Sequence, residues 1–192
     1  MDIEIPLLFD ESARKRWFVL RDLKRCNAKL PGYKQLWLAG IRQFTPMRQR
    51  LMSREGKRER VEMPVIPDLV FAQATRQELD PIVERTPTLQ YSFVRGGGYC
   101  EPMVVRDEEM ERFIHAIHNS ESQIYYLPSE ITPDMYGKEV RIIGGPLNEY
   151  TGRLLSVRGS RKRRLLIELP NFLTVAVEVA PEYIQFVNAK QK

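Results

Sequence analysis

Short apolar runs and helically spaced apolar residues alternate along the N-terminal part of the chain. Trp17–Leu20 is a compact apolar and aromatic run, which predicts a buried strand. From Tyr33 to Phe44 the apolar residues, Leu36 and Trp37 among them, follow helical spacing instead. This pattern predicts an amphipathic helix that packs its apolar stripe on a sheet, and Pro31 suits the start of such a helix.

Two more helices are predicted further along the chain. Thr75 and Glu78 have the spacing of a capping box, in which two side chains satisfy free backbone groups at the start of a helix. Pro81 conflicts with a regular helix interior, so this helix is expected to be kinked or to restart with Asp80 as its cap. Asp107 begins the other helix, where acidic residues in the first turn favour the dipole and a stripe of apolar residues follows.

The segment between the first two helices combines strands with a run of charge. Phe44–Met47 opens a strand, and the cation-rich segment Arg48–Arg60 predicts an exposed hairpin or a mobile loop. Pro64 and Pro67 lack the backbone donor that a central strand needs. A turn is therefore expected at these prolines, followed by a strand over residues 69–72.

Turn residues divide the next part of the chain. Residues 89–94 and 103–105 are predicted to be strands, with a turn at Gly96–Gly98 between them. Beyond the third helix, Asn119–Gln123 is polar and aperiodic, and prolines follow it. This composition predicts a linker that proteases can cut.

The C-terminal part contains only strand-like segments. From Asp134 on, short apolar runs are separated by turn residues, which predicts a small β-barrel. The expected strands cover residues 138–143, 150–157, 163–169, 174–179 and 183–187. Gly144, Gly145 and Pro146 form a strong turn signal after the first of them. Gly152, inside the second, indicates a bulge, a bend or a close backbone approach.

Length, composition and charge bound the possible functions. At 192 residues the chain can form one large domain or two small ones, and its apolar share of 43% is sufficient for a folded core. No run is long enough to span a bilayer, and the N-terminus lacks the features of a signal peptide. Cys26 and Cys100 are far apart, as expected for reduced cytoplasmic thiols. The net charge of +5 favours an anionic partner only weakly.

The C-terminal pattern resembles a known motif. The turn Gly144–Pro146 between two strands, with Gly152 beyond it, is similar to the KOW motif of SH3-like barrels in transcription and ribosomal proteins. The order of elements over residues 16–188 resembles the NusG family of transcription elongation factors, in which an NGN domain precedes a KOW domain. Phe44-Thr-Pro-Met-Arg48 further resembles the specialised NusG paralogues, among them the UpxY-type antiterminators of capsular polysaccharide operons.

Local matches support this resemblance. Trp17–Leu20 is similar to the family's opening strand, and Pro64–Phe71 to its Pro-x-Phe-Pro-x-Tyr-Val-Phe segment. Asp107–Met110 is similar to the start of the last NGN helix. In two departures from the family pattern, Ile66 and Leu69 replace the usual aromatics, and the tail before Trp17 is extra.

The resemblance implies the fold class and the domain bounds. It predicts an α+β chain, in which an NGN domain with an antiparallel sheet flanked by helices is followed by a C-terminal SH3-like β-barrel, the KOW domain. The bounds that follow are an N-terminal tail over 1–15, the NGN domain over 16–119, a linker over 120–133 and the KOW domain over 134–189.

The resemblance also implies a function. The family binds the clamp helices of RNA polymerase, so we expect a non-enzymatic, cofactor-free cytoplasmic monomer with no membrane partner. It would promote processive elongation or antitermination at selected operons, such as capsular polysaccharide clusters. The matching polymerase-binding positions are Phe44, Val65, Ile66, Leu69 and Phe71. Strand alternation predicts that about half of these side chains are core residues instead.

Two groups of cations are candidates for nucleic-acid or protein contacts. The first, which the resemblance places near the non-template DNA strand, comprises Arg48, Arg50, Arg54, Lys57, Arg58 and Arg60. The second, on a hairpin of the barrel, comprises Arg158, Arg161, Lys162, Arg163 and Arg164. This second group would meet RNA, a ribosomal protein or a termination factor. For both groups, a solvated hairpin with no partner is the simpler interpretation.

Two other functions remain open. One is a KOW-type RNA- or ribosome-binding protein without a polymerase role, whose RNA binding would survive deletion of residues 1–120. The other is a metalloenzyme, because His115 and His118 have the spacing that places two side chains on one helix face, and Cys100 could join them. No fourth ligand is adjacent in the sequence, and no nucleophile elbow, P-loop or dinucleotide fingerprint is present.

Overall fold

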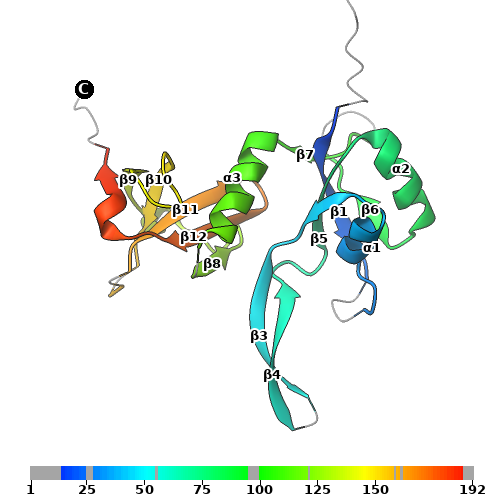
Figure 1. The fold of residues 1–192 in the computed structure, drawn as a ribbon, viewed down its shortest axis with the longest axis horizontal. Helices are drawn as coiled ribbons and strands as arrows, with labels where there is room; N and C mark the ends of the chain where they lie inside the picture. Colours follow the sequence, from blue (N-terminus) through cyan, green and yellow to red (C-terminus); the bar gives the residue numbers. More distant parts are fainter. Residues whose placement is uncertain are drawn as a thin grey trace, which may run out of the picture. The chain divides into compact units, whose positions relative to one another are not determined.

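The computed structural model divides into two compact units, Met1–Asp107 and Glu108–Lys192 (Figure 1). It describes residues 14–24, 28–54, 56–94, 100–120, 122–157, 159–160 and 162–187, with the backbone alone at 54 and 57. The predictions for most of the N-terminal tail, for Cys26, for the Gly96–Gly98 turn and for Arg158 and Arg161 therefore lie outside the described residues. No helix in the described ranges is long and apolar enough to cross a membrane.

The first unit is built on an antiparallel sheet. Its strands are β2 (Arg42–Phe44), β5 (Leu69–Ala74), β1 (Arg16–Asp22) and β6 (Leu89–Tyr91) in that order, and β7 (Val104–Val105) also pairs with β1. The central strand β1 is almost entirely buried, as its apolar run predicted.

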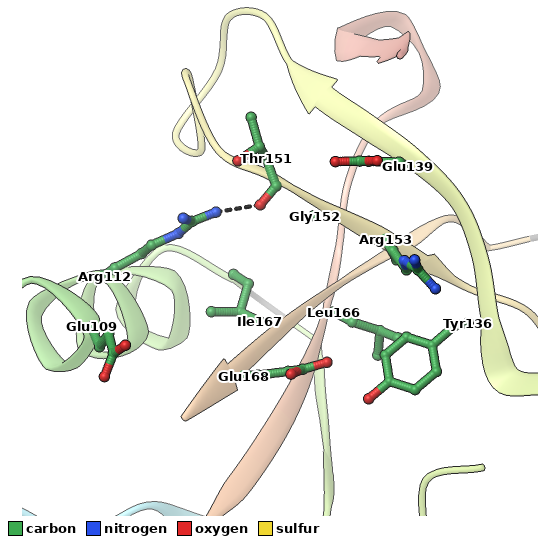
Figure 2. Close-up of a pocket in the computed structure, with 10 residues that line it drawn as sticks. All are labelled: Glu109, Arg112, Tyr136, Glu139, Thr151, Gly152, Arg153, Leu166, Ile167 and Glu168. Atoms are coloured by element: carbon green, nitrogen blue, oxygen red, sulfur yellow. Dashed lines mark hydrogen bonds between the residues drawn. The ribbon is translucent and has the colours of Figure 1, made fainter. Parts of the chain in front are cut away.

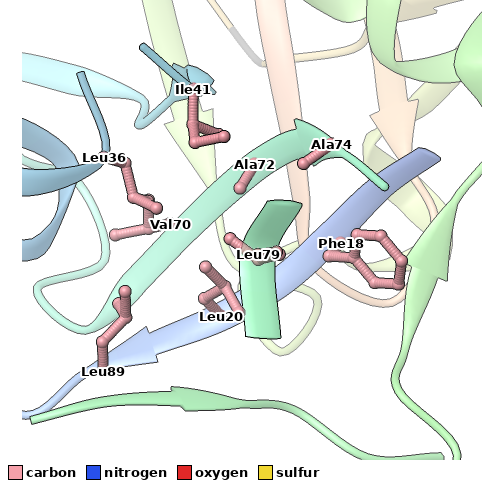
Figure 3. Packing of buried hydrophobic residues seen from close by; sticks show 9 residues of the cluster. All are labelled: Phe18, Leu20, Leu36, Ile41, Val70, Ala72, Ala74, Leu79 and Leu89. Atoms are coloured by element: carbon pink, nitrogen blue, oxygen red, sulfur yellow. The ribbon is translucent and has the colours of Figure 1, made fainter. Parts of the chain in front are cut away.

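Two helices complete the core of this unit. Helix α1 (Gly32–Leu38) contributes Leu36, and helix α2 (Arg76–Arg85) contributes Leu79, to one face of the sheet (Figure 3). Alternation along the strands places on that same face the side chains of Phe18, Leu20, Val70, Ala72 and Ala74.

The prediction of one long amphipathic helix up to Phe44 is wrong. Helix α1 ends at Leu38, Gly40 follows with a φ of 76°, and Phe44 belongs to strand β2. Trp37 is 68% exposed, although its spacing placed it on the buried stripe. A left-handed residue cannot continue an α-helix, so the apolar residues beyond Gly40 fold as a strand.

The capping box of α2 is confirmed. The Thr75 hydroxyl accepts from the Glu78 N–H, and the Glu78 carboxylate accepts from the Thr75 N–H at 2.8 Å. Helix α2 continues through Pro81, so the predicted restart at Asp80 is wrong. The Asp80 carboxylate instead accepts from Arg76 at 2.8 Å and from the Tyr91 hydroxyl at 2.7 Å.

The charged segment forms the predicted hairpin. Strands β3 (Met47–Arg54) and β4 (Lys57–Pro64) pair along their whole length and form a two-stranded sheet of their own. The described side chains on it are exposed or only partly buried.

The second unit holds a six-stranded antiparallel sheet. Its order is β13 (Ile184–Phe186), β9 (Tyr136–Ile142), β10 (Thr151–Leu155), β11 (Arg164–Leu169), β12 (Leu173–Glu178) and β8 (Gln123–Tyr126). Two 3₁₀ turns, η2 (Pro133–Met135) and η3 (Pro181–Tyr183), precede β9 and β13. The five strands predicted from Asp134 onward are confirmed within a few residues.

Two features differ from the expected domain bounds. Strand β8 lies inside the stretch predicted as a linker and pairs with β12 from Thr174↔Tyr126 to Val177↔Gln123. Helix α3 (Asp107–His118) falls almost wholly in the second unit, so the units divide after residue 107 rather than at 119. Gln123–Tyr126 is a run of four residues without a regular polar and apolar alternation, so its sequence does not distinguish it from the polar and proline-containing stretch around it.

Candidate functional site

The apolar residues expected to bind a partner lie around the base of the β3–β4 hairpin. The Val65 N–H donates to the Pro46 carbonyl at 2.8 Å, which closes the hairpin at its base. On the other side of the turn, the Arg21 guanidinium donates twice to the Asp68 carboxylate, at 2.7 and 3.0 Å. These contacts hold the turn that carries Ile66 against strand β1 and against the residue that precedes β3.

Burial divides the five predicted polymerase-binding positions. Phe44, Val65 and Ile66 are partly exposed, and we call them the hairpin-base surface. Leu69 is only 8% exposed and Phe71 is fully buried, and Phe71 lies opposite Phe44 in the ladder. A side chain with little or no exposed surface offers a partner almost nothing to contact, so the candidate surface is limited to the other three positions.

The hairpin cations occupy both faces of the β3–β4 ribbon. Side chains alternate along a strand, and directly paired residues share a face. By this register, Arg48 and Arg50 lie on one face, and Arg58 and Arg60 lie on the other. All four side chains are exposed, and none of the four guanidinium groups forms a hydrogen bond or ion pair with another described residue. Arg54 and Lys57 pair with each other at the tip, and their side chains lie outside the described part.

The glycine turn of the second unit has the tight geometry that its sequence indicated. Gly144 and Gly145 have φ values of 88° and 67°, which side-chain-bearing residues rarely adopt. The Gly144 N–H donates to the Asn148 side chain at 2.6 Å. A Cβ atom on Gly152 would lie 3.0 Å from the Leu166 carbonyl oxygen, which confirms the predicted close backbone approach.

The basic residues of the second unit are less free than the sequence suggested. Lys162 forms an ion pair with Glu178 at 2.7 Å, and this hydrogen bond lowers the pKa of the Glu178 carboxyl. Arg164 is partly buried at the start of β11, whereas Arg163 is exposed. Within this group, Arg163 is therefore the described cation best placed to meet a partner.

One hollow brings two predicted groups together. A depression of about 750 Å³ is lined by Gly144 and Pro146 of the glycine turn and by Lys162 and Arg163 of the basic group. Apolar side chains, Leu147 among them, line the same depression. We call it the turn hollow.

A second hollow, of about 490 Å³, was not predicted from the sequence (Figure 2). It is lined by helix α3 and strands β9, β10 and β11, and the Arg112 guanidinium reaches across to donate to the Thr151 carbonyl. On the opposite side, the hydrogen bond of Tyr136 to the Glu168 carboxylate raises the pKa of Tyr136. The sequence signal for this hollow is the polar side of α3, where Glu109 and Arg112 are one helical turn apart, and the apolar periodicity of the helix says nothing about their contacts.

His115, one of the two histidines considered as metal ligands, contacts Tyr150 in the structure. His115 stacks on the Tyr150 ring with centroids 5.8 Å apart, and its Nδ1 lies 3.0 Å from the Tyr150 hydroxyl. That hydroxyl donates to the Arg112 carbonyl at 2.9 Å. Among the described residues, no three histidine, cysteine or acidic side chains gather in a way that could hold a metal ion.

Comparisons with known proteins identify the family. A solved structure of Thermotoga maritima NusG, titled for its domain interaction, is similar to this chain. The similarity covers 92% of this chain and 99% of the Thermotoga maritima chain, with 16% sequence identity and a TM-score of 0.45. No curated protein matches the sequence. The family model described as transcription termination factor NusG matches residues 15–114, just over half of the chain. The chain therefore belongs to the NusG family of factors that regulate transcription elongation and antitermination.

Proposed function

We propose that this protein binds RNA polymerase through the hairpin-base surface and suppresses pausing or termination at selected operons, such as capsular polysaccharide clusters. The observation that carries the proposal is the apolar turn Val65–Ile66, which is partly exposed and held from both sides. Family membership supports a role in elongation, and the proposed operons rest on the resemblance of Phe44–Arg48 to specialised paralogues.

Polymerase binding would follow from burial of apolar surface. The clamp helices would cover Phe44, Val65 and Ile66, with a gain of about 25 cal/mol for each Å² removed from water. The turn is already ordered by the Val65–Pro46 and Arg21–Asp68 contacts. A preorganised surface loses less conformational entropy on binding, so even a small apolar patch can contribute to affinity.

The β3–β4 hairpin would contact DNA next to the polymerase. Its exposed guanidinium groups form no ion pair with another described residue, so they are available to phosphates. Contact with the non-template strand would keep the factor near the transcription bubble, while the hairpin-base surface holds the polymerase. The protein would act as a binding factor without catalysis.

The second unit would recruit another macromolecule. The turn hollow combines an apolar floor with the exposed cation Arg163, a combination that suits a protein partner with apolar and acidic groups. A ribosomal protein or a termination factor is the class of partner proposed for it. The pairing of Lys162 with Glu178 leaves Arg163 as the main specificity contact.

An Ile66→Asp variant tests polymerase binding. A charge placed in a desolvated apolar contact is strongly unfavourable, so affinity for core polymerase should fall about tenfold or more. Leu51→Asp is the matched control, because Leu51 is 57% exposed and lies on the hairpin away from its base. Both variants should keep the wild-type melting temperature. Equal affinity of all three proteins for polymerase would reject the hairpin-base surface.

A KOW-type RNA-binding protein without a polymerase role is the second candidate. The observation that favours it is the exposed Arg163 at the rim of the turn hollow. In that case Arg163→Gln would abolish RNA binding, whereas Ile66→Asp would change no measurable interaction. Pull-down of RNA polymerase by the wild-type protein, and its loss in Ile66→Asp, separates the two candidates.

A further inference from the structure

The β3–β4 hairpin is a ribbon with two open faces. Its strands form a separate two-stranded sheet, and each of their residues pairs with the other strand (Figure 1). Both exposed faces carry cations, as described above. A ribbon of this kind can meet a ligand on either face, or on both faces at once.

Each face of the ribbon carries a pair of exposed arginines among other side chains. On one face Arg48 and Arg50 accompany Glu59, and the partly exposed Met52 stands opposite Glu59. The other face holds a second pair of arginines with one glutamate, one exposed apolar residue and two exposed neutral polar residues: Arg58, Arg60, Glu62, Leu51, Gln49 and Ser53. Each face therefore presents two exposed guanidinium groups beside one glutamate. Neither face therefore lacks positively charged side chains.

The presence of exposed arginines on both faces bears on the kind of nucleic acid that the ribbon suits. A single strand can lie against only one face at a time, so the second pair of arginines would gain nothing from it. A double-stranded ligand offers two phosphodiester backbones, and the major groove of B-DNA is wide enough to admit a two-stranded ribbon. Two backbones can also flank the ribbon where a duplex opens into a fork.

We propose that the hairpin binds DNA that presents two backbones, with one backbone against Arg48 and Arg50 and the other against Arg58 and Arg60. This inference deepens the DNA contact in the proposed function and rests on it. It assigns the non-template strand to one face and gives the opposite face a second strand. Both arginine pairs are then required for full affinity.

Fluorescence anisotropy with the full chain tests the proposal. The probes are one labelled single strand, the blunt duplex that contains it and a forked duplex that contains it. The proteins are wild type, Arg48→Gln/Arg50→Gln and Arg58→Gln/Arg60→Gln. Lys29→Gln/Lys34→Gln is the control, because it removes the same charge at exposed sites outside the hairpin. Matching melting temperatures establish that every variant is folded.

Each arginine variant should lose about tenfold in affinity for the two-backbone probes. Removal of two phosphate contacts should also lower the slope of log K against log salt by about 1.8. On the single strand the intact face can replace the altered one, so each variant should lose only about twofold. Tighter wild-type binding to the blunt duplex identifies a groove, and tighter binding to the fork identifies separated strands.

The proposal is overturned if only one arginine pair matters for every probe. It is also overturned if either variant loses as much affinity for the single strand as for the duplex, or if wild type binds no probe. The measurement contains no polymerase. A negative result in this assay would therefore not argue against polymerase binding at the hairpin-base surface. In the same way, the effect of Ile66→Asp on polymerase binding would not bear on whether the hairpin binds DNA.

Discussion

Gly145 lies so close to the ring of Tyr183 that a Cβ atom at position 145 would be 2.8 Å from the ring carbon Cε2. The ring cannot move away easily, because Tyr183 is anchored by its backbone. Its carbonyl accepts from the Ile143 N–H at 2.8 Å, and its N–H donates to the Ala180 carbonyl at 3.1 Å. The glycine turn is thus held by a side chain from the 3₁₀ turn before β13, the strand that pairs with β9.

This contact predicts that Gly145→Ala is more damaging than an ordinary glycine replacement. The φ of 67° alone should cost about 1–2 kcal/mol for alanine, and the overlap with Tyr183 adds to it. Gly159→Ala is the matched control, since Gly159 has a φ of 82° with nothing within 4 Å of an added Cβ. Denaturant unfolding should show a larger loss for Gly145→Ala. Equal losses would mean that Tyr183 yields without cost.

Neighbouring positions on α1 should differ sharply in stability. Leu36→Ala removes a fully buried side chain and should lower the free energy of unfolding by about 2–5 kcal/mol. Trp37→Ala removes a larger side chain that is 68% exposed, so it should cost no more than about 0.5 kcal/mol. Urea melts of the two variants measure the difference. A cost for Trp37→Ala near that of Leu36→Ala would contradict the observed exposure.

The exposure of Trp37, which the helical spacing predicts to be buried, shows the limit of an argument from periodicity. Spacing alone placed Leu36 and Trp37 on one stripe, but a helix as short as α1 has room for only one buried turn. Leu36 occupies it beneath Ile41 and Val70 of the core cluster. The stop at Gly40 could be suspected from sequence, yet a glycine inside a helical pattern is also tolerated. The choice between those outcomes depends on tertiary packing.

Strands with a sharp local signal were predictable, and long-range pairings were not. The runs at Trp17–Leu20 and beyond Asp134 identify strands because apolar residues alternate with turn punctuation. Nothing in Gln123–Tyr126 indicates that it pairs with β12, since that pairing depends on residues about fifty positions away. The hairpin cations were found by composition, but their division between two faces required the register of β3 and β4.

The capping box of α2 should make stability depend on pH. The Glu78 carboxylate accepts from the Thr75 N–H and lies near Lys15, and these contacts lower the pKa of Glu78 below its usual 4.5. Because the folded pKa is the lower one, the stabilisation is present above 4.5 and is lost as the pH falls through the folded value. Glu78→Gln should therefore show a shallower loss of stability on acidification.

Thermal melts over a series of acidic buffers measure this dependence. Glu84→Gln is the control, because Glu84 is exposed on the same helix and its carboxylate accepts no hydrogen bond from a described residue. That variant should follow the wild-type acid profile. If Glu78→Gln follows it as well, the capping box contributes nothing that titrates.

Resistance to proteolysis should reveal strand β8. The polar composition of 119–133 predicted a cleavable linker, but Gln123–Tyr126 is paired with β12 and its backbone is engaged. Brief digestion of the native protein should leave this stretch intact. Ile124→Pro removes a backbone donor within β8 and should expose the segment to cleavage. Rapid cleavage within Gln123–Tyr126 of the wild-type protein would show that the strand does not persist in solution.

The contact of Tyr150 with α3 gives the last prediction. Its hydroxyl donates to the Arg112 carbonyl at 2.9 Å and lies 3.0 Å from His115 Nδ1, so it ties the helix to the sheet of the second unit. Tyr150→Phe keeps the ring but removes these hydrogen bonds, at a cost of about 1 kcal/mol. Amide hydrogen exchange in α3 should then quicken about fivefold if the helix opens locally. Tyr126→Phe is the control, because that hydroxyl has no hydrogen bond to a described residue. Unchanged exchange in Tyr150→Phe would mean that the Tyr150 hydroxyl does not contribute to holding α3 on the sheet.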